Sequence, residues 1–474
     1  MTFVDSRPVV RLDEPRSSWL VRRLGPAWPL KGLLLGFPLW WALGIAQFAF
    51  LSAAVAMAVQ MYRRGSIRVP AAFGVWLLFL VWMAAGVFVL WAHAPGTIDG
   101  NSPIRIIPFL FRVMWYLAIT VAVLYPLSMS SRILPAMDVA RWLAALFVFS
   151  VLASVAGLLV PHFQFTSLAE LIVPGARANG TFVHTMLHPA LTTGSEFLGY
   201  EQPRPKAPFA YPNAWGNNVG LLLPFFVVAW ANSKKRWQRV SVPVVLALFL
   251  LPVAYSLNRG LWLGILVVSV YAAVALARSG RLAALWTLIV VGIVATAILI
   301  GSPVWSTIML RIETPHSNAR RGTVAEVVID TTWHGSPLLG FGTTRKVTGN
   351  FASIAGTGST SCHQCSAPPL GTQGFLWRLI LTTGFVGTGL FGVFMAVQWF
   401  KHFRRRDVFS VVGCMCLVMS GLFFIVYDSL DSPLFILMLA IGLMNRERLQ
   451  DQVVGSGLAK ADVAVGPRML GRAR

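Results

Sequence analysis

Charged residues are scarce in this chain, and acidic residues are the scarcest. Only 12% of the 474 residues are charged and 56% are hydrophobic, whereas a soluble domain usually carries about 25% charged residues. This shortage excludes an ordinary soluble domain. Together with apolar runs that recur along most of the length, it indicates a polytopic membrane protein. The formal net charge of +22 does not require a nucleic-acid partner, because Lys and Arg gather in the cytoplasmic loops of membrane proteins.

Cysteines are few, and the sequence shows neither a nucleotide-binding motif in its glycine-rich stretch nor a pair of catalytic acids. Four cysteines are too few for a disulfide scaffold. The glycine-rich stretch "GSPLLGFGTTRK" has neither the G-x-G-x-x-G nor the G-x-x-x-x-G-K-[ST] spacing, which argues against a nucleotide site there. Its glycines instead predict a loop whose backbone closely approaches another segment. No D-x-D motif or glycosidase-type acid pair is evident.

The two ends of the chain differ from its apolar middle. Residues 1–27 lack the apolar core of a signal peptide and carry several arginines, so we expect a basic cytoplasmic tail. We expect a transmembrane domain over 28–450. Residues 451–474 read as a disordered cytoplasmic tail whose basic residues contact anionic lipid headgroups.

The apolar stretches predict an all-α fold with about 12 transmembrane helices. Each span needs roughly 20 mostly apolar residues. The first two stretches can form either a tight helical hairpin or one long helix broken at Pro38. The predicted spans are about 28–43, 45–62, 71–92, 106–127, 139–160, 214–231, 240–256, 258–277, 283–302, 374–399, 408–427 and 431–445.

The short links between spans predict the orientation. "MYRRGSIR", "NSKKRWQR", "ARSGR" and "FKHFRRRD" all fall on one side, whereas the opposite links "YSLNRG" and "YDSLDSP" together hold one basic residue. By the positive-inside rule, the basic links and both termini lie in the cytoplasm. Two long polar segments, about 161–213 and 303–373, then form extracytoplasmic loops, and loops of this length are usually functional or disordered.

Several cations stand where an anionic substrate would meet the outer face. Arg259 lies at the outer end of two spans, where it either snorkels or binds phosphate. Arg320 and Arg321 precede an amphipathic helix predicted over Thr323–Thr332, with Val324, Val327, Val328 and Thr331 on one face. The arginine pair is either a solvated helix start or an anion site.

The first long loop and the glycine-rich stretch add further candidates. Asn213 opens a predicted span, with Arg204 and Lys206 nearby, and we expect these side chains to bind a sugar or phosphate. The alternative is an ordinary interfacial position, marked by Trp215. Arg345 ends the glycine-rich stretch and is a further candidate for substrate binding.

The stretch "CHQCSAPPLGTQG" in the second long loop allows more than one interpretation. The histidines of the second long loop, including His334 and His363, are either exposed loop residues or catalytic bases. Cys362 and Cys365 lack the second ligand pair of a structural zinc site. On an oxidising outer face a small disulfide between them is favoured, and we expect no metal site. Cys414 and Cys416 fall inside a span and are predicted to pack in the core.

Taken in order, these pieces resemble the bacterial O-antigen ligase and O-antigen polymerase superfamily over roughly residues 205–395. The resemblance rests on "YPNAWGNN", "SLNRGLWLGILVVSVYAAV", "RRGTVAEVVIDTTWHGSPLLGFGTTR" and "GTQGFLWRLILTTGFVG". It implies a glycosyltransferase C-like membrane fold in the bacterial cytoplasmic (inner) membrane. It also implies transfer of a glycan from a polyprenyl-diphosphate carrier to a glycan, lipid or protein acceptor, without a metal or other cofactor.

The resemblance also implies roles for particular residues. Arg259 and Arg321 or Arg320 match the arginines that would hold the diphosphate, whose leaving charge needs stabilising. Thr372 and Gln373 occupy the place of the family's proposed base histidine, and neither side chain takes a proton at neutral pH. Gln373 is then expected to bind substrate, and His363 is the nearest replacement for the base.

Two other functions stay open at the level of the sequence. A flippase or other transporter of lipid-linked oligosaccharides would line a midplane cavity with polar groups and often shows repeated halves. This chain places its cations at the outer mouth and has no visible repeat, which favours the enzyme. A non-catalytic glycan-assembly protein would be consistent with the missing histidine.

Overall fold

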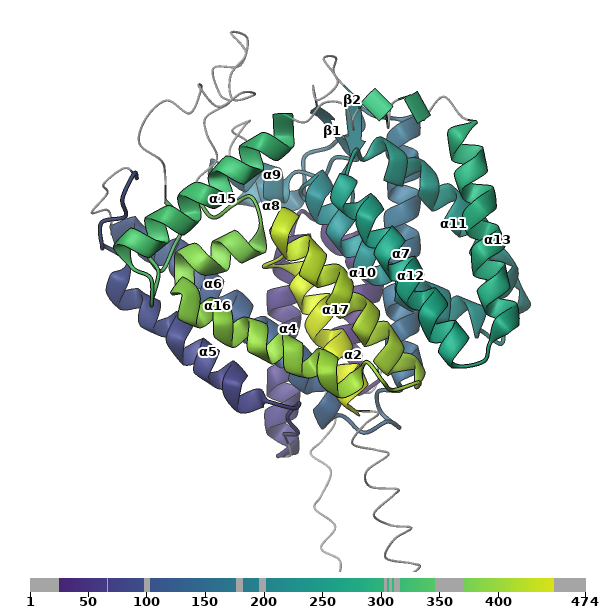
Figure 1. The fold of residues 1–474 in the computed structure, drawn as a ribbon, viewed down its shortest axis with the longest axis horizontal. Coiled ribbons are helices and arrows are strands. Elements are labelled where there is room, and N and C mark those ends of the chain that lie inside the picture. Colours follow the sequence, from purple (N-terminus) through teal and green to yellow (C-terminus); the bar gives the residue numbers. More distant parts are fainter. Residues whose placement is uncertain are drawn as a thin grey trace, which may run out of the picture.

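The computed structural model describes residues 25–65, 67–97, 103–175, 182–195, 202–301, 305–306, 309–310, 316–345 and 370–446. The described chain is mostly helical, with one small two-stranded sheet (Figure 1). The elements are α2 (Trp28–Leu35), α3 (Phe37–Ala42), α4 (Ala46–Arg64), α5 (Phe73–Ala85), η1 (Gly86–Val89), η2 (Pro103–Arg105), α6 (Ile106–Ser128), α7 (Ala136–Leu159), α8 (Leu168–Ile172), α9 (Phe182–Leu187), β1 (Thr192–Ser195), β2 (Gln202–Pro205), α10 (Pro212–Ala231), α11 (Arg236–Tyr255), α12 (Arg259–Arg278), α13 (Leu282–Ile300), α15 (His316–Gly335), α16 (Phe375–His402), α17 (Val408–Val426) and a C-terminal helix, Ser432–Arg446.

Helices occupy every stretch for which the sequence predicts a span, which supports an all-α membrane protein. Among the described residues, seven helices are long and apolar enough to cross a membrane. Three further apolar helices are shorter, so the number twelve stays a prediction. At the N-terminal side the chain forms a hairpin, the first of the two predicted alternatives: α2 and α3 both pack against α4. The helix breaks at Gly36 and turns at Gly44, whose φ of 77° favours glycine.

The main core is one continuous cluster of buried apolar side chains that includes the C-terminal helix. Three fully buried indoles, those of Trp76, Trp115 and Trp215, anchor it. Cys414 and Cys416 are completely buried in α17 as free thiols, which confirms their predicted packing position.

One end of the bundle gathers the basic links, and we call it the basic end. There Gln398 near the end of α16 donates to the carbonyl oxygen of Ala71 at 2.7 Å and accepts from Asn445 at 2.8 Å. Arg278, which ends α12, donates to the carbonyl of Phe403 at 3.2 Å. Links that the positive-inside rule assigns to the same side therefore meet in the fold, although their cytoplasmic placement stays a prediction.

The other end, here called the loop end, gathers the long polar segments (Figure 1). Gln47 at the start of α4 donates to Asp431 at 2.8 Å, and Arg204 in β2 donates to the carbonyl of Ser256 at 2.7 Å. Helices α8 and α9 and the antiparallel pair β1–β2 also lie there. The chain thus brings segments far apart in the sequence to one end of the bundle.

Helix α15 confirms the predicted amphipathic helix in the second long loop and extends it at both ends. Val324, Val328 and Thr331 are buried, while Glu326 and Asp330 are exposed. The apolar face packs on α16, in a small cluster separate from the main core. Burial of one valine side chain contributes about 1.5 kcal/mol or more, so this face holds α15 to the bundle.

The predicted close backbone approach also occurs, between residues 336–342 and α16. The backbone of helix α16 is non-helical at Gly384, where φ is 66°. Near this break the amide of Phe341 donates to the carbonyl of Leu381 at 2.8 Å. A Cβ atom on Gly340 would lie 2.6 Å from the amide nitrogen of Gly384. Only glycine fits at so close an approach, which explains this part of "GSPLLGFG".

Candidate functional site

The interior of the loop end holds a group of charged side chains that we call the acid–arginine group. Arg378, in the first turn of α16, forms an ion pair with Asp428 in the link that follows α17. Asp431, at the end of the same link, accepts a hydrogen bond from Gln47 through Oδ2. The Arg378 and Asp428 side chains are 19% and 33% exposed. The pair is therefore sheltered but reachable.

Burial changes the proton affinity of both carboxyl groups. It raises the pKa of Asp428, although the positive charge of Arg378 opposes the change. Burial and the negative charge of Asp428 together raise the pKa of Asp431 to about 7. The Oδ1 atom of Asp431 is buried and has no hydrogen-bond partner among the described residues. The Ser432 side chain interacts with the carboxyl group and partly opposes the rise of its pKa.

A second arginine, Arg112, lies next to the acid–arginine group. Arg112 of α6 is buried and donates to the carbonyl oxygen of Gly342. It lies close enough to Arg378 and Asp428 for their charges to interact. Two positive charges and two titratable acids, contributed by α6, α16 and the link after α17, therefore meet in one region. Tyr211, before α10, lies near both aspartates: burial and their negative charge raise its pKa.

Arg345 lies in the same part of the fold but has a different environment. The residue is 2% exposed, and its guanidinium donates to the carbonyls of Leu90 at 2.8 Å, Phe341 at 3.0 Å and Thr343 at 3.3 Å. Burial, together with nearby Arg105, lowers its pKa to about 10. Three backbone carbonyls accept hydrogen bonds from this guanidinium group. Arg345 therefore joins residues 341–345 to the segment after η1.

The two basic residues predicted in the first long loop are both buried. Arg204 donates to the carbonyl of Ser256 and, at 3.1 Å, to Oδ1 of Asn258, which fastens β2 to the turn between α11 and α12. Lys206 is 8% exposed. Burial lowers the pKa of Lys206. A buried cation in this state would be stabilised by an anionic ligand.

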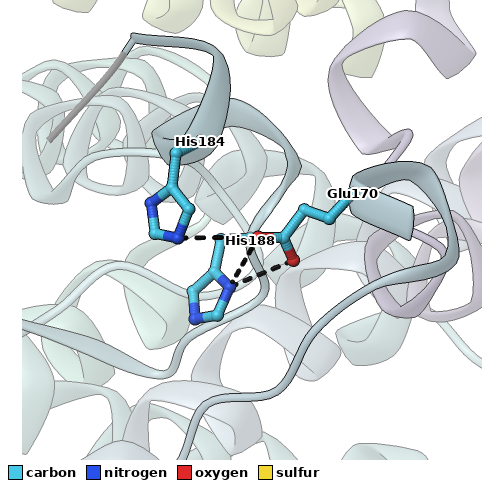
Figure 2. A group of neighbouring side chains, drawn as sticks. All are labelled: Glu170, His184 and His188. Atoms are coloured by element: carbon cyan, nitrogen blue, oxygen red, sulfur yellow. Dashed lines mark hydrogen bonds and ion pairs between the residues drawn. The ribbon is translucent and has the colours of Figure 1, made fainter. Parts of the chain in front are cut away.

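A third group consists of Glu170, His184 and His188 (Figure 2). Nδ1 of His188 lies 3.0 and 3.1 Å from the two carboxylate oxygens of Glu170, and Nε2 of His184 lies 3.5 Å from Oε1. The imidazole rings stack with their centroids 4.5 Å apart. Desolvation and the charge of His188 lower the pKa of His184, and Lys206 adds to this effect, while Glu170 opposes it.

Local sequence explains how Glu170 is held. Ser167 is the N-cap of α8, and its backbone amide donates to Oε2 of Glu170 at 2.8 Å in a capping box. The Ser167 hydroxyl donates to the carbonyl of Leu187 at 2.7 Å, which joins α8 to α9. The amide of Ala169 donates to the carbonyl of Leu43. One backbone amide therefore holds the carboxylate, and two further hydrogen bonds fasten α8 to its neighbouring segments.

The loop end also contains a pocket. It is bounded by the turn between α3 and α4, the end of α9 and residues 208–210. Gln47, the partner of Asp431, and His188, the partner of Glu170, both line it. The pocket is thus lined by one member of the histidine group and by the residue that holds Asp431.

The other predicted site residues whose side chains the structure describes lie at separate positions. Arg259 begins α12 and is partly exposed, next to Gly260, which packs against the hydroxyl of Tyr427. Asn213 lies in the first turn of α10 and Gln373 just before α16, both partly exposed. His334 is exposed on α15 and pairs with Asp330 at 3.0 Å.

Other predicted residues cannot be placed. His363, Cys362 and Cys365 lie outside the described residues, so the disulfide and the proposed base stay predictions. Arg320 and Arg321 lie in α15, but their side chains fall outside the described part of the structure.

Sequence reasoning missed the acid–arginine group and the histidine group. Two signals were available for the second: the spacing H-x-x-x-H, His184 to His188, and the capping-box pattern Ser167 to Glu170. For the first, Arg378 stands inside the quoted stretch "GTQGFLWRL", and "YDSLDSP" carries two acids in an outer link. Which of these residues meet depends on helix packing that no local pattern contains.

Comparison with known proteins yields no match: no family model, no curated protein and no solved structure matches this chain. The resemblance to the O-antigen ligase and polymerase superfamily therefore rests on the sequence motifs alone. The chain is an all-α polytopic membrane protein, as its helices and their apolar composition indicate.

Proposed function

We propose that this protein transfers a glycan from a polyprenyl-diphosphate-linked donor to an acceptor hydroxyl at the loop end of the bundle. The observation that carries the proposal is the sheltered ion pair of Arg378 and Asp428 beside Asp431. It lies at the start of the span in which the sequence motif places the catalytic region. We further propose that this end faces away from the cytoplasm.

The arginines fit the leaving group. A guanidinium forms paired hydrogen bonds with phosphate oxygens, and Arg378 exchanges its carboxylate partner for the diphosphate when the donor binds. Arg112 adds a second positive charge while keeping its bond to Gly342. Positive charge placed in advance at a developing anion is the largest catalytic contribution in many enzymes.

Asp431 fits the role of the base. Its Oδ1 atom is available to accept a proton, and a pKa of about 7 suits general-base catalysis near neutral pH. The acceptor oxygen forms a bond to the anomeric carbon as its proton passes to Asp431. The bond between that carbon and the diphosphate oxygen breaks, and the diphosphate leaves with the electron pair.

The other residues predicted from the sequence keep their proposed roles. Arg321 or Arg320 would contact the diphosphate from α15, and Arg259 would do so from the start of α12. His363 is the alternative base to Asp431. Lys206 is a further cation available to an anionic donor.

The test is a transfer assay with purified full-length protein, a lipid-linked oligosaccharide and an acceptor. We expect wild-type transfer, and loss of transfer for Arg378→Gln and Asp431→Asn. The matched control is Arg141→Gln, which removes a different arginine–aspartate pair, with Asp138, exposed at the start of α7. His363→Ala and Arg321→Ala in the same assay compare the two candidate bases and the loop arginine.

Two outcomes would reject the proposal. Absence of transfer by the wild type with every tested acceptor would remove the enzymatic function. Movement of the carrier lipid across proteoliposomes without bond cleavage would favour the lipid-linked oligosaccharide flippase instead.

A further inference from the structure

We propose that Glu170, His184 and His188 form a binding site for one zinc ion at the loop end. The sequence predicted no metal site, and the proposed transfer reaction does not require one. The site is independent of the proposed function, because it rests on a different set of side chains.

The donor atoms have the spacing of a zinc site. In a tetrahedral site with zinc–nitrogen and zinc–oxygen bonds of about 2.0–2.1 Å, neighbouring donor atoms lie about 3.3 Å apart. Here Oε1 of Glu170 lies 3.0 Å from Nδ1 of His188 and 3.5 Å from Nε2 of His184. All three donor atoms lie within 4.8 Å of one another. Small side-chain rotations would place them around one ion.

The outer partners also suit a metal ligand. Nε2 of His188 lies 3.2 Å from the amide oxygen Oε1 of Gln164, a partner to which it can donate a hydrogen when Nδ1 serves as the metal ligand. Nδ1 lies 3.0 and 3.1 Å from the two carboxylate oxygens of Glu170. A zinc ion bound between these atoms would take the place of a proton shared by the imidazole and the carboxylate. Ligating histidines in proteins characteristically donate their second nitrogen in this way.

The two carboxylate oxygens of Glu170 have different partners. Oε2 of Glu170 accepts from the backbone amide of Ser167, while Oε1 faces both histidines (Figure 2). Glu170 is 3% exposed, and a buried carboxylate requires compensation by positive charge. The histidine side chains are 19% and 14% exposed, which leaves a path for an ion to enter.

The ligand types select zinc over the lighter divalent ions. Imidazole nitrogen suits zinc, whereas magnesium and calcium prefer sites made of oxygen ligands. Three protein ligands leave the fourth position open, and His188 borders the pocket. The bound ion would join α8 to α9 and present an open coordination position near the pocket. Lys206 lies close to His184 and opposes cation binding, which the experiment below exploits.

The experiment measures zinc in full-length protein purified in detergent with a tag that contains no histidine. The protein is stripped with a chelator, reloaded with zinc and analysed for metal content and affinity. We expect one zinc per chain, no comparable binding of magnesium, and the visible spectrum of four-coordinate cobalt after cobalt substitution. Affinity should fall at least about 30-fold in His188→Ala and Glu170→Gln.

Three further variants make the result decisive. His162→Ala removes an exposed histidine of the same loop and should leave zinc binding unchanged. Lys206→Met removes a nearby positive charge and should tighten binding several-fold. His184→Ala leaves the capping box intact, so it decides the matter if Glu170→Gln fails to fold. Zinc retained with wild-type affinity in both His184→Ala and His188→Ala, or no stoichiometric zinc in the wild type, would overturn the proposal.

Discussion

Two arginines at the loop end, Arg345 and Arg378, illustrate how the same side chain serves different purposes. Arg345 is buried and directs its guanidinium at three backbone carbonyls. Arg378 is partly accessible and pairs with Asp428, a side chain that can move or accept a proton. Backbone carbonyls in a packed segment cannot leave, whereas a carboxylate partner can be replaced by phosphate. The first arrangement favours stability and the second favours binding.

The largest expected effect comes from breaking the second arrangement. Arg378→Gln should lower kcat/KM for glycan transfer by about 100-fold or more, because it removes a donor to the leaving diphosphate. The thermal unfolding midpoint in detergent should change little, since the pair is partly exposed. If Arg378→Gln instead lowers the unfolding midpoint but transfers glycan at the wild-type rate when folded, Arg378 is a structural residue like Arg345 and the prediction is wrong.

Removing the first arrangement should affect stability. Arg345→Met removes three buried hydrogen bonds, to the carbonyls of Leu90, Phe341 and Thr343, which we expect to destabilise the protein by about 2–3 kcal/mol. Thermal unfolding measured with Arg378→Gln alongside gives the comparison. If Arg345→Met keeps wild-type stability and raises KM, the sequence prediction that Arg345 binds substrate is correct and the structural assignment is wrong.

The pKa of Asp431 predicts how transfer depends on pH. Its value of about 7 in the folded protein means that the carboxylate, the form able to accept a proton, is lost as pH falls through 7. Transfer should therefore decrease about tenfold per pH unit below that point. Asp431→Glu should retain some activity with a shifted profile. An unchanged pH profile in Asp431→Glu would assign the base elsewhere, with His363 the next candidate.

The same group has an opposite effect on stability. Because its pKa is raised from the ordinary value, the folded protein binds a proton more tightly than the unfolded chain between about pH 4 and 7. The stability associated with protonated Asp431 is fully present below that window and is lost as pH rises through it. Comparison of wild type with Asp431→Asn by thermal unfolding across the window should show a smaller pH dependence in the variant.

The smallest effect is expected at an exposed pair. His334 and Asp330 are 65% and 72% exposed on α15, and such pairs contribute less than about 1 kcal/mol. His334→Ala should change the free energy of unfolding by less than about 0.5 kcal/mol and leave transfer unaltered. A raised KM in this variant would instead support the sequence prediction that His334 binds substrate.

Local patterns predicted much of the fold because they depend on neighbouring residues. The apolar stretches located the helices, and the valine spacing in Val324–Thr331 identified the buried face of α15. Gly340 and Gly342 indicated that the backbone of their loop closely approaches another segment, which is α16. Each of these inferences needs only chain periodicity or the absence of a side chain, both of which are visible in the sequence.

The candidate site was less predictable because its members come from distant parts of the chain. Arg204 was expected to bind substrate, yet its guanidinium is engaged by Ser256 and Asn258. Arg378 and Asp428 were not selected, although both are present in stretches that the sequence argument quotes. Charge and residue type identify candidates, but only packing determines whether a cation meets a carbonyl, a carboxylate or a pocket.

By itself, the sequence determined the membrane class, the helix positions and the division between basic links and long polar loops, because hydropathy and charge act locally. The tertiary structure alone decided which polar side chains face one another. It joined Glu170 to His184 and His188, and Arg378 to Asp428, across separate segments. Such meetings follow from how helices pack and where the connecting loops return, and these are long-range properties that no short stretch encodes.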